Sequence, residues 1–138
     1  MLKDEKYIEI CGEASNGLET ILKAKRLGPD LIIMDMSMPG SSGFSAATKI
    51  RQARMHAKIL FFTTHQAHEI ERMARLAGFE GLVRKAEAAR DLLRGVRAIL
   101  QGNRFFGGQI ISEEDKQTSK RNEQASKRRA PRSGAASA

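Results

Sequence analysis

Three polar residues, Asp35, Thr63 and Lys85, each follow a short apolar run in the sequence. In an open parallel sheet the carboxyl ends of the strands meet at one edge, so these side chains would converge there. A carboxylate, a hydroxyl and an ammonium group together suit phosphoryl transfer to an aspartate. The carboxylate attacks as the nucleophile, while the hydroxyl and the ammonium group stabilise charge on the phosphoryl oxygens. A Mg²⁺ ion would normally bridge the carboxylate and the phosphate.

Taken singly, each of these residues also fits an ordinary structural role. An aspartate after a strand is most often a turn or helix-capping residue. Thr63 alone suits the cap of the next helix, and Lys85 alone suits a solvated loop. Their joint placement at three strand ends therefore carries the chemical prediction, rather than any one residue type.

The elements that would position these residues alternate along the chain. Strand-like runs are expected at Tyr7–Cys11, Leu31–Met34, Ile59–Phe62 and Leu82–Val83. Each is followed by a helical pattern, and the apolar stripes of these helices are Leu18-Ile21-Leu22, Phe44-Ala47-Ile50, Ile70-Met73-Ala74-Ala77 and Leu92-Leu93-Val96-Ile99-Leu100. Gly28-Pro29, Gly78 and Gly102 are predicted to end three of the helices.

This alternation predicts an α/β fold with a parallel sheet and right-handed crossovers. The first residues of the four strand-like runs are 24, 28 and 23 residues apart. That spacing matches the size of one β-α unit. We therefore predict four such units in a doubly wound arrangement.

The sequence resembles the receiver domain of two-component response regulators, and most of all the LuxR/NarL-type subfamily. The similarity covers residues 5–106, and the segments that carry it are 12–17, 29–39, 58–63 and 81–85, which include Pro29-Asp30-Leu31-Ile32-Ile33-Met34-Asp35-Met36-Ser37-Met38-Pro39. The resemblance implies a flavodoxin-like (CheY-like) fold. It further implies that Asp35 is the phospho-acceptor, Thr63 the switch hydroxyl and Lys85 the phosphate-pairing lysine. The backbone carbonyl of Ser37 would join Asp35 in binding Mg²⁺.

Two departures from the family pattern stand out. A receiver has five strands in the spatial order 2-1-3-4-5, and an acidic pair that ends its first strand holds Mg²⁺. The match here begins just before the second strand, so we expect one β-α unit and that acidic pair to be absent. The loss predicts marginal stability, closure of the gap by direct pairing, or strand exchange with another chain. Leu82 also stands where the family usually has an aromatic switch residue.

The expected domain organisation is a truncated receiver domain over residues 1–107, followed by a linker remnant and a disordered basic tail over residues 108–138. Residues 102–108 resemble the linker that leads to a helix-turn-helix output domain in LuxR-type regulators, and no such domain is expected here. The net charge of +8 lies mostly in the tail, because residues 116–138 carry seven basic residues and one acidic residue. DNA binding is not expected beyond weak non-specific contact through residues 116–132, and a solvated tail is favoured.

Composition excludes several other classes of protein. No apolar run approaches the length of a membrane span, and the single cysteine, Cys11, cannot form an internal disulfide. A cytoplasmic protein with no membrane association is therefore expected. The sequence has no glycine-rich phosphate loop, Ser-His-Asp arrangement or metal-ligand cluster, so we do not predict an enzyme.

Two functions fit these observations. The first is a receiver module of a phosphorelay, in which a sensor histidine kinase supplies the phosphoryl group and the module can form dimers with itself or with other receivers. The second is a phosphorylation-independent interaction module that pairs with full-length regulators. Its helical faces at Ile70–Ala77 and Leu92–Leu100 would meet the partner.

Overall fold

The computed structural model of the chain describes residues 7–36, 43–64 and 68–112. They form a five-stranded sheet in the order β1-β2-β3-β4-β5, in which only β5 runs antiparallel to its neighbour. The strands are β1 (Leu31–Asp35), β2 (Lys58–Thr63), β3 (Gly81–Arg84), β4 (Arg104–Phe106) and β5 (Gln109–Ile111). The helices are α1 (Gly17–Leu27), α2 (Gly43–Gln52), α3 (His68–Leu76), the short 3-10 helix η2 (Lys85–Glu87) and α4 (Ala88–Leu100).

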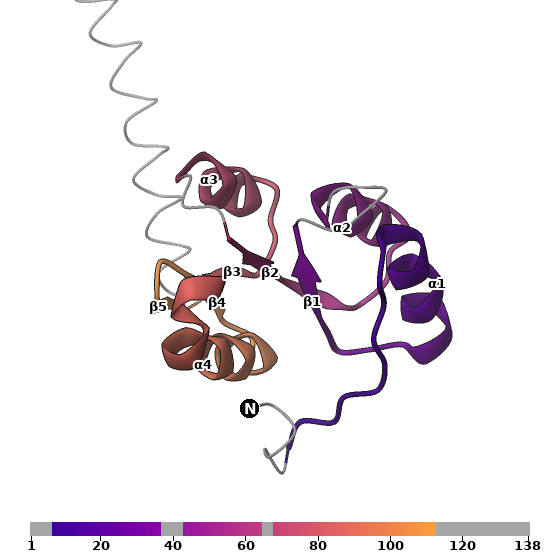
Figure 1. The fold of residues 1–138 in the computed structure, drawn as a ribbon, viewed down its shortest axis with the longest axis horizontal. Coiled ribbons are helices and arrows are strands. Elements are labelled where there is room, and N and C mark those ends of the chain that lie inside the picture. Colours follow the sequence, from indigo (N-terminus) through magenta and orange to yellow (C-terminus); the bar gives the residue numbers. More distant parts are fainter. Residues whose placement is uncertain (1–6, 37–42, 65–67, 113–138) are drawn as a thin grey trace, which may run out of the picture.

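The helices cover the two faces of the sheet unequally. Figure 1 shows α2 and α3 on one face, with α1 beside α2, and α4 on the opposite face. The buried cluster under α2 and α3 includes Met34, Ile50, Ile59, Phe61, Phe79 and Phe106. The cluster under α4 comprises Leu60, Val83, Val96, Ala98, Ile99 and Phe105. Helices on both faces of a mostly parallel sheet confirm the predicted CheY-like α/β class.

The predicted helix boundaries follow local capping chemistry. The side chain of Asn16 accepts a hydrogen bond from the Glu19 amide, which satisfies one free N–H at the start of α1. Gly28 ends the same helix in the left-handed conformation with φ of 58°. In the described part of the chain no helix is long and apolar enough to cross a membrane.

The strand expected at Tyr7–Cys11 is not formed. Residues 8–14 have no regular secondary structure, and the side chains of Tyr7 and Ile10 are exposed. Nor does any described strand pair with the outer edge of β1, so the predicted direct closure of the gap is not observed. An alternating sequence forms a strand only where a neighbour supplies the hydrogen-bond ladder. Three of the four predicted strands are formed, so the expectation of four β-α units was wrong.

The β4–β5 hairpin was not predicted. Residues 102–108 were interpreted as a linker, yet β4 joins the sheet beside β3, and β5 extends it to Ile111. Both residues of the turn, Gly107 and Gly108, have positive φ, which is the backbone that a tight hairpin turn needs. The guanidinium of Arg104 fixes the hairpin by donating hydrogen bonds to the backbone carbonyls of Phe79 and Arg75. The 113–138 tail lies outside the described residues.

Candidate phosphoryl-acceptor site

The strand register sets the predicted site residues at one edge of the sheet. Asp35 is the last residue of β1 and lies beside Phe62 of β2. Thr63 is the next residue of β2 and lies beside Arg84, which directly precedes Lys85. The three predicted residues thus occupy the carboxyl ends of three adjacent parallel strands, where α/β folds place reactive groups.

Asp35 and Lys85 are in direct contact. The Lys85 ammonium donates a hydrogen bond to Oδ2 of Asp35 over 2.6 Å, although the two residues are 50 positions apart in the sequence. The side chains keep 38 % and 33 % of their surface exposed, so the carboxylate can be reached from solvent. The ammonium also lies 5.7 Å from the centroid of the Phe62 ring. This is a solvent-accessible carboxylate held beside one positive charge.

The start of helix α2 lies very close to the backbone of Asp35. A Cβ atom at Gly43 would lie 2.3 Å from the backbone carbonyl oxygen of Asp35. Only glycine therefore fits at the start of α2, and the contact fixes the backbone of Asp35 against the helix. The predicted magnesium ligand Ser37 falls in the 37–42 segment, outside the described residues.

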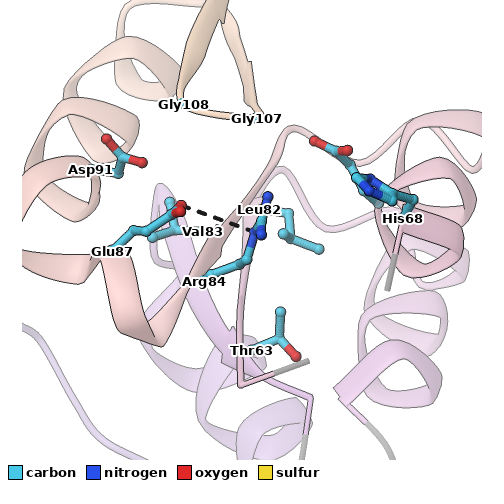
Figure 2. A pocket seen from close by; sticks show the side chains of 10 residues that line it. Thr63, His68, Leu82, Val83, Arg84, Glu87, Asp91, Gly107 and Gly108 are labelled. Atoms are coloured by element: carbon cyan, nitrogen blue, oxygen red, sulfur yellow. Dashed lines mark ion pairs between the residues drawn. The ribbon is translucent and has the colours of Figure 1, made fainter. Parts of the chain in front are cut away.

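Thr63 is at the same edge but its side chain lies in a separate small cavity. Phe62 packs against the cluster on the α4 side of the sheet, and its register partner Asp35 faces the same side. Because side chains alternate along a strand, the next residue, Thr63, points to the other side. Thr63 is 1 % exposed and lines a cavity of about 10 Å³, room for about one water molecule. Figure 2 shows Thr63 at the base of this cavity, below the Arg84–Glu87 ion pair. The structure thus brings Asp35 and Lys85 together and places Thr63 next to them.

The residues that the structure describes do not fit a magnesium site by themselves. Receiver domains in general bind Mg²⁺ at the phosphorylation site. Within the described ranges, however, no three His, Cys, Asp or Glu side chains are grouped to hold a metal ion. Asp35 therefore offers a single carboxylate whose nearest charge is already the ammonium of Lys85. A hard divalent cation bound through one such ligand would keep most of its water.

A buried carboxylate that the sequence did not reveal borders the cavity of Thr63. The side chain of Asp91 is 2 % exposed and accepts hydrogen bonds from the guanidinium groups of Arg90 and Arg94. These bonds, chiefly that of Arg90, lower the pKa of Asp91 below its usual value against the opposing effect of burial. Gly108 packs directly on the carboxylate, because a Cβ there would lie 3.4 Å from Oδ2. Asp91 therefore joins α4 to the turn of the hairpin.

The lowered pKa of Asp91 predicts a pH-dependent contribution to stability. A carboxylate whose pKa is lower in the folded state stabilises the fold fully above its unfolded pKa and loses this contribution as the pH falls through the folded value. Asp91→Asn is expected to lower the free energy of unfolding by about 1–2 kcal/mol at pH 7. The difference from wild type should shrink below about pH 4. Urea unfolding across this range checks it, and a difference that stays constant to acid pH would contradict the assignment.

The sequence family follows from comparison with known proteins. The family described as "Response regulator receiver domain" matches residues 1–97. The chain belongs to this family. It is 30% identical to the response regulator UvrY of Escherichia coli K12 over 113 residues, which are 82% of this chain and 52% of UvrY. It is 32% identical to VraR of Staphylococcus aureus Mu3 over 110 residues, 80% of this chain and 53% of VraR. The chain spans about half the length of these curated relatives.

Solved structures show the same fold. A two-component response regulator of the LuxR family from Aurantimonas sp. SI85-9A1 superposes with a TM-score of 0.66 and 32% identity, over 78% of this chain and 74% of that chain. The isolated receiver domain of RcsB from Salmonella enterica serovar Typhimurium, solved with the phosphomimetic BeF3-, gives a TM-score of 0.71. That match has 23% identity and covers 84% of this chain and 83% of the other, so it supports the fold alone. The resemblance to LuxR/NarL-type receivers is confirmed.

Proposed function

We propose that this receiver domain accepts a phosphoryl group on Asp35. The observation that carries the proposal is the Asp35–Lys85 ion pair of 2.6 Å, formed by a solvent-accessible carboxylate at the carboxyl edge of the sheet. An accessible carboxylate can act as a nucleophile, and the adjacent ammonium group supplies the positive charge that an incoming phosphoryl group requires. Receiver domains are generally signal modules rather than enzymes, so the product is the modified protein itself.

In the proposed step, a carboxylate oxygen of Asp35 attacks the phosphorus of a donor. For a phosphohistidine donor a new O–P bond forms, the P–N bond breaks, and its electron pair remains on the imidazole nitrogen, which takes up a proton. The ammonium of Lys85, which pairs with the carboxylate before transfer, then pairs with the negatively charged phosphoryl oxygens. Thr63 ends the neighbouring strand but its side chain lines a separate cavity, so we assign its hydroxyl a hydrogen bond to a phosphoryl oxygen that forms only when the side chain turns toward Asp35 after transfer.

The partners follow from the same proposal. Response regulators are generally phosphorylated by sensor histidine kinases, and we assign such a kinase as the donor here. We further propose that the protein is cytoplasmic. We also propose that it pairs with a second copy of itself or with another receiver. The basic tail at residues 116–132 would add at most weak, salt-sensitive contacts with nucleic acid.

Intact-mass spectrometry tests the acceptor role of Asp35. The wild-type chain is incubated with acetyl phosphate, with and without Mg²⁺, and is expected to gain one phosphoryl group that Asp35→Asn does not gain. The variant should remain folded, because a half-exposed ion pair contributes only about 0–1 kcal/mol. Far-UV circular dichroism checks its fold. A wild-type chain that gains no mass under either condition would contradict the proposal.

A second candidate is a receiver that acts through binding without phosphorylation. It is favoured by the single carboxylate of the described site, whose charge the ammonium of Lys85 balances. This alternative expects a regulator partner to bind wild type and Asp35→Asn equally well in isothermal titration calorimetry. Binding that strengthens only after acetyl phosphate treatment of the wild type would exclude it.

A further inference from the structure

The outer edge of β1 is a row of backbone groups without a neighbouring strand. The amide of Lys58 donates to the carbonyl of Asp30, and the amide of Met36 donates to the carbonyl of Phe62. Bonds to one parallel neighbour involve alternate residues, so the even-numbered residues of β1 bond to β2. The N–H and C=O groups of Leu31 and Ile33 therefore point to the opposite edge. No strand in the described part of the chain lies there.

The same strand also presents apolar side chains that the fold covers poorly. Ile33 lies beside Leu60, which is fully buried, yet Ile33 itself is 36% exposed. Both residues face the α4 side of the sheet (Figure 1). Parallel strands are normally covered on both faces, and an exposed apolar edge strand favours pairing with another strand.

The first six residues and residues 113–138 are poor in strand-forming residues. Residues 113–138 contain no Val, Ile, Leu, Met or aromatic residue, and four of residues 1–6 are charged. Neither composition is typical of a strand on an apolar edge.

The sequence Tyr7–Cys11, by contrast, alternates as a strand does and has no strand neighbour. Tyr7 is 93% exposed and Ile10 is 43% exposed, while Ile8, like Leu31, packs against the cluster under α4. Within its own chain the segment leads into a stretch held on α1 rather than on the sheet. The ammonium of Lys23 donates a hydrogen bond to the carbonyl of Glu13, and Gly12 lies against the side chain of Leu27. In Figure 1 this indigo stretch passes alongside α1 without joining β1.

We propose that two copies of the chain pair by strand exchange, in which Tyr7–Cys11 of each copy adds to the free β1 edge of the other. The exchange satisfies the outward-facing groups of Leu31 and Ile33 and buries Ile10 and Ile33 in both copies. Because each copy donates one strand and receives one, the contact closes as a two-fold dimer. The pairing does not depend on the phosphoryl chemistry at Asp35.

Cross-linking tests the geometry directly, because Cys11 is the only cysteine of the chain. Ile33→Cys adds a second thiol on the edge, and a short bis-maleimide reagent is expected to join two chains on a denaturing gel. The same variant combined with Cys11→Ser should lose most of this product. Met73→Cys, at a 52% exposed position on α3, should give little of it. An internal cross-link within one chain, or no cross-link, would overturn strand exchange.

Measured mass in solution tests the same interface without added cysteines. Light scattering after size exclusion is expected to give the mass of two chains for wild type and for Met73→Lys. Ile33→Lys places a charge on the free edge and should raise the dimer dissociation constant at least about tenfold. A monomeric wild type, or an Ile33→Lys variant that stays dimeric, would overturn the proposal. If Ile33→Lys fails to fold by circular dichroism, the cross-linking result decides.

Discussion

Phe105→Ala is expected to lower the free energy of unfolding by about 3–5 kcal/mol, which is a large part of the stability of a small domain. The Phe105 side chain is fully buried and belongs to the cluster beneath α4. Its ring lies against Gly95, where an added Cβ would be 3.1 Å from it, and 5.6 Å beneath the guanidinium of Arg94. Backbone atoms line part of this site, so a truncated side chain would leave a cavity.

Urea unfolding followed by circular dichroism measures this effect. Ile110→Ala is the matched control, because Ile110 lies on the same hairpin and is 51% exposed. The control should change the unfolding free energy by no more than about 0.5 kcal/mol. Equal, small effects of both substitutions would show that β4 is not an integral strand of the domain.

Lys85→Gln is expected to slow phosphoryl transfer to Asp35 by about 100-fold. The substitution keeps a polar side chain of similar length but removes the ammonium charge, which lies 2.6 Å from the carboxylate. Loss of one group that stabilises developing charge commonly costs this much in rate. The effect should appear in the rate of phosphoryl gain, because the attacking carboxylate is retained.

A time course of intact mass with acetyl phosphate gives the two rates. Lys49→Gln, on the exposed surface of α2, makes the same charge change away from the site and should leave the rate unchanged. An unchanged rate in Lys85→Gln would contradict the role assigned to Lys85. A loss of rate in Lys49→Gln would indicate a general effect of net charge instead.

The sequence predicted the strands that are built from continuous apolar runs, although β1, unlike the largely buried β2, keeps Ile33 exposed. The run Leu31–Met34 and the run Ile59–Phe62 became β1 and β2 because continuous apolar residues suit a strand covered by helices. The Asp35–Lys85 contact then followed from the parallel direction of the strands. By contrast, the alternation of Tyr7–Cys11 was a weaker guide, because it specifies a strand only if a neighbour is present.

The hairpin and the role of Asp91 were missed for a different reason. Two short β-forming runs around Gly107-Gly108 are the usual signal for a hairpin, but the similarity of residues 102–108 to an interdomain linker points away from one. Asp91 was not singled out because its burial depends on how α4 packs against the Gly108 turn, a contact between segments 17 positions apart. The cavity beside Thr63 likewise depends on the packing of α3 and α4.

Locating the phosphoryl group on the chain tests the central claim most directly. After treatment with acetyl phosphate, borohydride reduces an aspartyl phosphate to homoserine: a first hydride displaces phosphate from the acyl carbon to leave an aldehyde, and a second hydride with a proton from water gives the alcohol. Mass spectrometry of peptides then identifies the converted residue. We predict conversion at Asp35 and none at the neighbouring Asp30. Conversion at another aspartate, or none in a folded wild-type chain, would contradict the assignment of Asp35 as the acceptor.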